Sequence, residues 1–483
     1  MRIIIVGGNH AGIAAALRIR EEYPDDEVIV FEKKDEITFV SQTIPLFLMG
    51  HQDIHSQANY ATPHEIIAQG VDLRIQKEVT NIDAKKMTLN FRNVLSQHEH
   101  EISYDRLIMA VGSYPNLPPT GGKLNETLFL LKERKDAEAI EKFISEAHHA
   151  VVIGAGLVGV EIARILAQRK MKVTLIQSNA RILDKNLDEN AAIEVEKQLE
   201  EEGIQLLLGT RVTSYHTIDK KIWSRPKIEV QTSSDLTIRA DGVFVSVGFR
   251  PNSFLLAGQV ETGDRGAIVV DKYMYTTDDS ILAVGDCSTT YMDLTKENIY
   301  NPHASDAFRQ GLIAAVNIHE KKQEVAMTTG TYKFNMDGFT IANTGITLNQ
   351  AKKFGYDAEE VHYQNRYLER GGQFVHESIV KYSPIDKDKK NHYSSIYLVY
   401  EKQTKKILGL QVLGTVDISQ YVNIISLAIQ KNVTVPEIEF TDFFFEHGYK
   451  NPLGFTKILA SLVREKERES GHDGKEERSI EIK

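Results

Sequence analysis

Two glycine-rich turns, each between an apolar run and a segment with helical character, are the parts of this chain best suited to chemistry. The first turn covers residues 7–12 after the apolar run 3–6, and the second covers residues 154–159 after the run 150–153. In such turns the glycines permit a tight bend and close packing, and the following helix presents backbone N–H groups to a pyrophosphate. One turn binds one dinucleotide, so two turns predict a hydride donor and a second, differently built redox cofactor.

The residues around the two turns differ in charge. Glu32 stands 20 residues after Gly12, at the end of the next apolar run, where its carboxylate can accept hydrogen bonds from ribose hydroxyls. The first turn carries Asn9 in place of the middle glycine, whereas the second turn has all three glycines. After the second turn, Gln177 stands where a strand-end acid is expected, and Arg181 lies nearby. Glutamine brings no charge to repel a 2′-phosphate, so NADH and NADPH both remain open and NADH is favoured.

A third candidate for chemistry is Asp286, which follows the apolar run 280–284. A carboxylate at the carboxyl end of a buried strand projects into the ligand crevice of an open sheet. Together with the two turns it predicts a flavin whose ribityl hydroxyls bond to this acid. Cys287 comes next and is the single cysteine of the chain. It is either a redox thiol or a buried, inert residue, and its place beside the acid favours the second interpretation.

The composition is that of a soluble globular protein. The 483 residues exceed what one hydrophobic core serves, and we expect two to four domains. The net charge of −10 argues against nucleic acid as a partner, and no apolar run approaches the ~20 residues of a membrane span. The first residues form a strand instead of a signal peptide, so we expect a cytoplasmic protein. The histidines of 98–100 and 148–149 lack the further ligands of a closed metal site, and we predict no metal.

The apolar runs predict an α/β fold followed by a C-terminal region of another kind. Strands are expected at residues 3–6, 27–31, 106–111 and 280–286 in one domain, and at 150–153, 172–177 and 241–248 in a second domain inserted into it. Helices are expected at 13–20 and 160–170. Alternating segments at 394–400 and 406–412 predict an antiparallel hairpin before a helix at 418–431. We predict a split domain at 1–118 and 245–325, an inserted domain at 119–244, an α+β domain at 326–463 and a charged mobile tail at 464–483.

Together these motifs resemble those of the FAD-dependent pyridine nucleotide–disulfide oxidoreductases, in the branch that holds NADH oxidase, NADH peroxidase and CoA-disulfide reductase. The resemblance covers roughly residues 1–463 and rests on both turns, on 110–113, 247–252 and 284–287, and on the C-terminal motifs 442–445 and 451–452. It implies two Rossmann-like dinucleotide-binding domains, one for FAD and one for NAD(P)H, and a C-terminal α+β dimerisation domain. It also implies a homodimer in which residues 443–449 approach the partner's flavin site.

The same resemblance assigns the cofactor-binding residues. FAD would be lined by Gly7, Gly8, Asn9, His10, Ala11, Gly12, Glu32, Ser41, Val79, Ala110, Val111, Gly112, Ser113, Lys132 and Asp286. NAD(P)H would be held by Gly154, Gly156, Leu157, Val158, Gly159, Val160, Glu161, Gln177 and Gly248. Val79 and Lys132 are placed by spacing alone.

The chain departs from the family pattern at the redox centre. Relatives carry a redox-active cysteine beside the flavin in the short motif after Glu32, and here Gln42 holds that position, preceded by Ser41. An amide cannot form a sulfenate or a mixed disulfide, and a serine hydroxyl has no accessible redox cycle. His10, which the peroxidase branch shares, either protonates or polarises a reduced oxygen species or only fixes the start of the helix. His10 and Gln42 are therefore the candidate catalytic residues.

Three functions remain open. The leading hypothesis is an NAD(P)H oxidase, in which hydride passes from the nicotinamide to FAD and electrons then pass to oxygen. Its product would be hydrogen peroxide, because no thiol at Gln42 receives a second electron pair. The first alternative is an NAD(P)H-dependent reductase of a quinone or a small redox protein. The second is a flavin- and nucleotide-binding interaction protein with little turnover, which the two nucleotide turns argue against.

Overall fold

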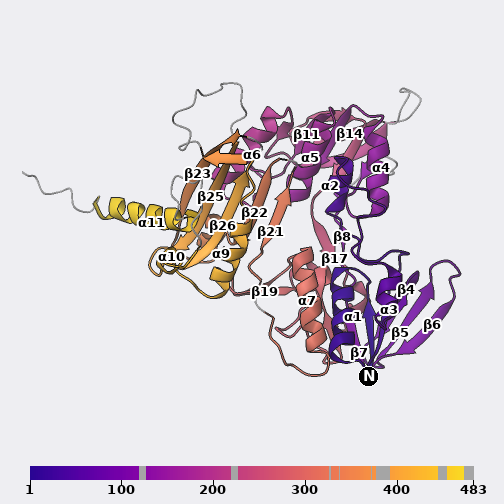
Figure 1. The fold of residues 1–483 in the computed structure, drawn as a ribbon. Helices are drawn as coiled ribbons and strands as arrows, with labels where there is room; N and C mark the ends of the chain where they lie inside the picture. Colours follow the sequence, from indigo (N-terminus) through magenta and orange to yellow (C-terminus); the bar gives the residue numbers. More distant parts are fainter. Residues whose placement is uncertain are drawn as a thin grey trace, which may run out of the picture. The chain divides into compact units, whose positions relative to one another are not determined.

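The computed structural model describes residues 1–118, 127–218, 227–325, 328–336, 338–370, 373–376, 392–443 and 454–472 (Figure 1). The chain divides into two compact units. The first unit holds Met1–Lys185 and Ala192–Thr328, and the second holds Asn186–Ala191 and Thr329–Lys483. None of the helices in the described residues has the length and hydropathy needed to cross a membrane.

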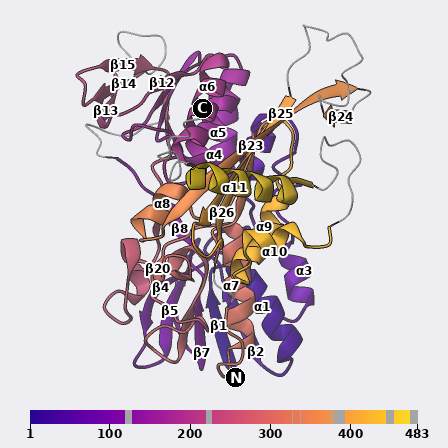
Figure 2. The ribbon, with the colours of Figure 1, turned by 90° about the vertical axis from the view of Figure 1, so that its left-hand side faces the viewer.

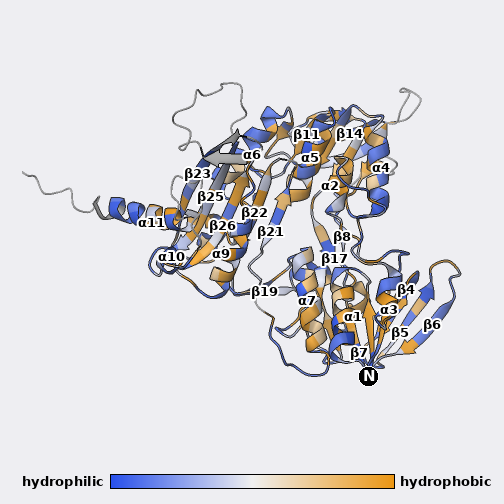
Figure 3. Cartoon of the chain, in the orientation of Figure 1, coloured by the Kyte–Doolittle hydropathy of each residue, from blue (hydrophilic) through white to orange (hydrophobic). Residues whose placement is uncertain are grey.

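The first glycine turn belongs to a five-stranded parallel sheet in the first unit. In spatial order its strands are β18 (Ile281–Ala283), β7 (Arg106–Met109), β1 (Arg2–Val6), β2 (Glu27–Phe31) and β3 (Asp72–Arg74). Helices α1 (His10–Glu22) and α7 (Ala304–Val316) pack against each other. The central strands are buried and hydrophobic along almost their whole length, as a parallel sheet covered on its faces requires (Figure 3).

The second glycine turn belongs to a second five-stranded parallel sheet with the same strand–turn–helix order. In spatial order its strands are β12 (Gln205–Leu207), β11 (Lys172–Ile176), β10 (His149–Ile153), β16 (Gly242–Val245) and β9 (Leu128–Phe129). Its helices are α4 (Arg134–Ile144), α5 (Leu157–Gln168) and α6 (Glu189–Glu201). Each turn therefore lies at the carboxyl end of a central strand, where open parallel sheets bind ligands.

Smaller elements complete the first unit. One antiparallel sheet consists of β4 (Lys77–Asp83), β5 (Thr88–Asn93) and β6 (Glu99–Ser103). Another consists of β13 (Val212–Ile218), β14 (Lys227–Thr232) and β15 (Thr237–Ala240). Short elements are α2 (Thr43–Leu48), α3 (Pro63–Ala68), η1 (Phe254–Leu256), η2 (Asp264–Gly266), η3 (Gly285–Cys287) and the pair β19 (Thr290–Met292) and β20 (Glu297–Ile299). Strands β8 (Ser113–Pro115) and β17 (Phe249–Pro251) pair with each other, so the chain leaves the first sheet and returns to it through one antiparallel ribbon.

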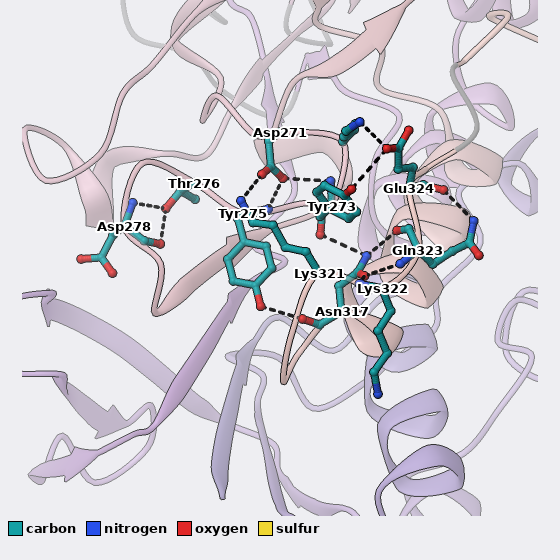
Figure 4. Close-up of polar contacts among 11 residues, drawn as sticks. Asp271, Tyr273, Tyr275, Thr276, Asp278, Asn317, Lys321, Lys322, Gln323 and Glu324 are labelled. Carbon is teal, nitrogen blue, oxygen red and sulfur yellow. Dashed lines mark hydrogen bonds and ion pairs between the residues drawn. The ribbon is translucent and has the colours of Figure 1, made fainter.

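A buried asparagine fixes the loop that follows α7. Asn317 Oδ1 accepts hydrogen bonds from the N–H groups of Lys322 and Gln323, both at 2.8 Å, and Tyr275 Oη donates to the Asn317 carbonyl at 2.6 Å (Figure 4). Breaking bonds to a buried amide is costly, because its polar atoms cannot reach water instead. The carboxyl end of α7 is therefore held firmly in the first unit.

The second unit is built on a six-stranded antiparallel sheet. In spatial order its strands are β21 (Tyr332–Asn335), β22 (Thr340–Gly345), β26 (Ile407–Gly414), β25 (His392–Glu401), β23 (Ala358–Arg370) and β24 (Gln373–His376). Its helices are α8 (Leu348–Lys353), α9 (Gln420–Gln430), α10 (Val435–Glu439) and α11 (Gly454–His472). The predicted hairpin is confirmed by the pairing of β25 with β26, and the predicted helix that follows it is α9.

The helix α11 extends past Arg464, where the tail is predicted to begin, and runs across the strands of the second unit (Figure 2). An ion pair and a hydrogen bond hold this part of the helix. Arg464 pairs with Glu439, and Lys466 Nζ donates to the Glu360 carbonyl at 3.0 Å. The sequence shows no apolar stripe here because charged side chains make these contacts. Residues 473–483 lie outside the described residues, so the mobile tail stays a prediction.

Candidate functional site

Close backbone contacts fix the first glycine turn at the carboxyl end of β1. Gly7 has a φ of +113°, and a Cβ atom there would lie 2.2 Å from the Ala110 carbonyl oxygen. A Cβ atom on Gly12 would lie 1.9 Å from the Gly7 carbonyl oxygen. A side chain at either position would displace backbone atoms. The N-terminus of α1 is thereby held close to the end of β1, as a dinucleotide turn requires.

The carboxylate of Glu32 faces this turn from the end of β2. Its Oε2 accepts a hydrogen bond from the Gly8 N–H at 2.8 Å, and its Oε1 accepts one from the Lys34 N–H at 2.8 Å. A carboxylate fixed in this way keeps lone pairs for ribose hydroxyls. Asn9, which departs from the glycine pattern, donates from Nδ2 to the Phe39 carbonyl at 3.3 Å. Its amide thus joins the turn to the segment that leads to α2.

A polar cluster gathers three of the predicted residues from distant parts of the sequence. Ser113 Oγ donates to Asp286 Oδ2 at 2.8 Å, and Lys132 Nζ donates to Ser113 Oγ at 2.8 Å. Lys132 Nζ also lies 3.6 Å from Asp286 Oδ2 and 4.5 Å from the centre of the Phe249 ring. Burial lowers the pKa of Lys132, and the Asp286 carboxylate opposes this effect. The spacing that suggested Lys132 therefore brings its ammonium group to the strand-end acid.

Tyr300 belongs to the same neighbourhood, although nothing in the sequence distinguishes it from the other tyrosines. Tyr300 is 8% exposed, and its hydroxyl lies near Ser113 and Asp286 without a well-formed hydrogen bond to either. Burial raises the pKa of Tyr300, and the charge of Asp286 adds to this effect. An unpaired buried hydroxyl costs about 1–3 kcal/mol. A polar ligand beside Asp286 would remove that cost.

These groups fit the flavin nucleotide that the sequence predicts. The start of α1 offers backbone N–H groups to a pyrophosphate, Glu32 offers acceptors to a ribose, and Asp286 offers acceptors to a ribityl chain. The backbone between them is fixed, because Gly112 has a φ of +67° and its carbonyl accepts from the Asn252 N–H at 2.9 Å. Val79 is buried in the core of the first sheet. The contacts of the individual residues with FAD stay predictions.

The second glycine turn has the same geometry as the first. Gly154 has a φ of +97°, and a Cβ atom there would lie 2.5 Å from the Ser246 carbonyl oxygen. A Cβ atom on Gly159 would lie 1.8 Å from the Gly154 carbonyl oxygen. Gly156, at the start of α5, has open space where its side chain would stand. The turn thus holds α5 close to β10 and leaves room for a ligand at the helix N-terminus.

Glu161 is a buried acid on α5, one turn beyond the glycines. Its side chain is 9% exposed, and burial raises the pKa of Glu161 to about 8. This shift favours the neutral carboxylic acid over the carboxylate at neutral pH. Gly248, the other predicted residue of this region, has a φ of +94°, which favours glycine.

Gln42 is exposed and begins the short helix α2. The segment before it is held to the first turn, because the Thr38 N–H donates to the Gly8 carbonyl at 3.2 Å. The Ser41 carbonyl accepts from the Ile44 N–H at 3.1 Å in the first turn of α2. Helix α2 packs against α5, which follows the second turn. The structure therefore places Gln42 between a segment that is bonded to the first turn and a helix that packs against α5.

His10 is the first residue of α1 and lies beside Tyr60. Its Nδ1 is 3.4 Å from Tyr60 Oη, and the two rings stack with their centres 5.7 Å apart. Burial lowers the pKa of His10, so its imidazole is largely neutral near pH 7. Tyr60 comes from the loop before α3 and is not predicted from the sequence. Its ring restricts the orientation of the His10 imidazole.

The single cysteine lies in surroundings that make its thiol unreactive. Cys287 is fully buried, and its thiol lies 3.3 Å from the carbonyl oxygens of Met109 and Val284, either of which can accept its one hydrogen. Burial raises the pKa of Cys287 to about 12, so the reactive thiolate is scarce at neutral pH. The structure therefore supports the interpretation of Cys287 as an inert core residue.

Most of the chain matches one protein family. The family described as pyridine nucleotide-disulphide oxidoreductase matches residues 1–311, and the dimerisation domain of the same family matches residues 336–447. The chain belongs to this family. It is an oxidoreductase that uses FAD and NAD(P)H, and its mixed α/β fold with a C-terminal dimerisation domain is confirmed.

Relatives of known activity cover nearly the whole chain. An NADH oxidase of Enterococcus faecalis is 31% identical over 465 residues, which are 96% of this chain and 100% of the relative. The structure of a water-forming NADH oxidase from Lactobacillus brevis, bound to NADH, has a TM-score of 0.88 and 30% identity, and the match covers 98% of this chain and 100% of that one. An NAD-dependent persulfide reductase from A. fulgidus has a TM-score of 0.86 at 27% identity, over 97% of this chain and 84% of that one. The assigned site residues and the domain boundaries stay predictions.

Proposed function

We propose that this protein oxidises NAD(P)H with molecular oxygen and releases hydrogen peroxide. In balanced form, NAD(P)H, one proton and O2 give NAD(P)+ and H2O2. When bound, FAD would accept the hydride from the nicotinamide and supply the electron pair that reduces oxygen. The similarity to NADH oxidases supports oxygen as the acceptor. The product is inferred from residues of this chain.

The proposal of hydrogen peroxide as the product rests on the lack of an accessible thiol. A thiol enzyme reduces oxygen to water by way of a cysteine that is oxidised and reduced again with a second electron pair. Gln42 stands at the position of that cysteine, and its amide has no such redox cycle. Cys287 is the single cysteine of the sequence and is fully buried. The reaction should therefore end after two electrons.

The described residues supply binding groups and a proton. Lys132, Asp286 and Ser113 form a connected set of hydrogen bonds that can hold the flavin end of FAD. His10 carries a proton on one ring nitrogen when neutral and stands at the start of α1, next to the pyrophosphate turn. From there its neutral imidazole can polarise reduced oxygen through a hydrogen bond, and its protonated fraction can transfer a proton that solvent replaces.

The test is the stoichiometry of the purified, FAD-loaded enzyme. NADH oxidation, oxygen consumption and peroxide formation are measured in the same reaction. We expect one NADH and one H2O2 for each O2, and we expect added catalase to return half of the consumed oxygen. Two NADH for each O2, without peroxide, would refute the proposed product. Oxidation of NADH that consumes no oxygen would refute the oxidase itself.

We also propose that the second unit mediates a homodimer. The residues matched by the dimerisation domain lie in this unit, and two of its large apolar side chains are strongly exposed, Leu427 at 59% and Phe440 at 83%. Contact with a second subunit would remove the apolar surface of these two side chains from water. Of the predicted partner-facing segment, residues 444–449 lie outside the described residues. Light scattering should give twice the mass of one chain, and the mass of one chain at micromolar concentration would refute the dimer.

A further inference from the structure

The two nucleotide turns share a backbone hydrogen bond, so one can be compared with the other inside the same chain. The Gly7 N–H donates to the Phe31 carbonyl at 2.8 Å in the first turn. The Gly154 N–H donates to the Ile176 carbonyl at 2.8 Å in the second. Corresponding residues of the two turns can therefore be identified without reference to another protein.

In each turn the next backbone N–H donates a hydrogen bond to the side chain of the residue that follows the neighbouring strand. Glu32 Oε2 accepts from the Gly8 N–H at 2.8 Å, and Gln177 Oε1 accepts from the Ala155 N–H at 3.1 Å. Gln177 thus keeps the structural contact that Glu32 makes in the first turn. Gln177 does not supply the negative charge that Glu32 carries in the first turn.

A carboxylate stands next to Gln177 in the folded chain. Gln177 Nε2 donates to Asp184 Oδ1 at 3.2 Å, and Asn179 Nδ2 donates to Asp184 Oδ2 at 2.6 Å. Two amides therefore orient the Asp184 carboxylate, while the residue stays exposed to solvent. A carboxylate has about four lone-pair positions, so two remain for the hydroxyls of a ribose.

The loop that carries Asp184 is fixed to the nucleotide turn. The Leu183 N–H donates to the Ala155 carbonyl at 2.9 Å, and the Ile182 N–H donates to Glu196 Oε1 at 3.1 Å. The Ile182 and Leu183 side chains are 0% and 1% exposed. These contacts hold Asp184 in a constant position relative to the turn.

The nearest candidate for binding a 2′-phosphate is already paired. Arg181 Nη1 lies 3.1 Å from Glu196 Oε2, and the Glu196 side chain is only 10% exposed. Because a nearly buried carboxylate neutralises the guanidinium, Arg181 offers little attraction to a phosphate. Lys185 follows Asp184 in the sequence and is the remaining cation of this loop.

We propose that Asp184 selects NADH over NADPH. Its carboxylate accepts a hydrogen bond from the 2′-hydroxyl of the adenosine ribose and repels the 2′-phosphate of NADPH. The usual acid for this purpose stands at the strand end itself. Here the strand-end position holds Gln177, and the charge comes from a loop seven residues further along the chain. This inference rests on the proposed function, because it names the nucleotide that the same enzyme oxidises.

The test is isothermal titration of the FAD-loaded enzyme with NAD+ and NADP+, which measures binding without turnover. We expect the wild type to bind NAD+ at least tenfold more tightly than NADP+. The Asp184→Asn variant should lose about tenfold of this preference, or about 1.4 kcal/mol. Asp235→Asn is the matched control, because it removes the same charge from an exposed turn between β14 and β15.

The possible results separate this inference from the oxidase proposal. A wild type that prefers NADP+, or a preference that Asp184→Asn and Asp235→Asn change equally, would overturn the role of Asp184. Loss of NADP+ binding in Lys185→Ala with an unchanged preference in Asp184→Asn would also overturn it. Failure of the oxidase proposal shows in the NADH-to-oxygen ratio and leaves the nucleotide preference untouched. Far-UV circular dichroism and FAD content confirm that each variant is folded.

Discussion

Replacing Glu161 by glutamine tests the buried acid of the second turn. Burial raises the pKa of Glu161 from its ordinary value of 4.5 to about 8. Between these two pH values the folded chain holds a proton that the unfolded chain has released. Raising the pH through this window therefore lowers the free energy of unfolding, and the loss is complete above about pH 8.

The size of the effect follows from proton linkage. Each pH unit within the window lowers the free energy of unfolding by about 1.4 kcal/mol for one proton. Between about pH 5.5 and pH 7.5 the contribution of Glu161 amounts to about 2–3 kcal/mol. Glutamine has nearly the same shape and no titrating proton. The Glu161→Gln variant should therefore gain stability over the wild type by this amount as the pH rises.

The assay is urea-induced unfolding at a series of pH values, followed by far-UV circular dichroism in a fixed excess of FAD. His10 and Glu360 also have shifted pKa values, so the informative quantity is the difference between variant and wild type. Glu101→Gln is the matched control, because Glu101 is exposed on β6. An identical pH slope in Glu161→Gln and wild type would show that Glu161 is ionised in the folded chain, and it would refute this reasoning.

Three further changes probe other parts of the chain. Gln42→Cys restores a thiol at the exposed start of α2, and we expect the NADH-to-oxygen ratio to rise from one towards two, with one thiol reactive towards a disulfide reagent. Lys132→Met removes the ammonium 3.6 Å from Asp286, so the FAD dissociation constant, measured by flavin fluorescence, should rise about tenfold. Asp188→Ala removes the acceptor of the Leu348 N–H at 2.7 Å in the second unit, and urea unfolding should show a loss of about 3 kcal/mol. An unchanged ratio, dissociation constant or midpoint would contradict the respective prediction.

The nucleotide turns could be predicted because their signals are local. The spaced glycines and the flanking apolar runs lie within a few residues of each other. Strands β1, β2 and β10 form where these runs predict them. The helices begin earlier than predicted, α1 at His10 and α5 at Leu157. The reason is that Gly12 and Gly159 lie inside the helices, where close packing against the strand outweighs the low helix propensity of glycine. The strand predicted at 106–111 ends at Met109, and Gly112 beyond it has a positive φ.

The arrangement around Asp286 could be predicted only in part, because its members meet through long-range folding. Ser113 is predicted from a motif of the family resemblance, and Lys132 is predicted from spacing alone. Tyr300 carries no motif, and its unpaired hydroxyl becomes visible only when burial is known. Asp184 also could not be predicted from the sequence, because the orientation of its carboxylate depends on hydrogen bonds from two amide side chains across a loop. Sequence patterns therefore find the residues that shape the backbone, and the structure adds those that complete a polar site.

Two positions of this chain lack the residue that the family pattern leads one to expect, and their surroundings differ. At Gln177 the backbone contact is kept, and Asp184 places a carboxylate within hydrogen-bond reach. At Gln42 no sulfur is available, because the single cysteine, Cys287, is buried in the core. The proposed nucleotide selection at Asp184 and the missing thiol at Gln42 together favour an enzyme that takes up hydride and passes the electron pair from the flavin directly to its acceptor.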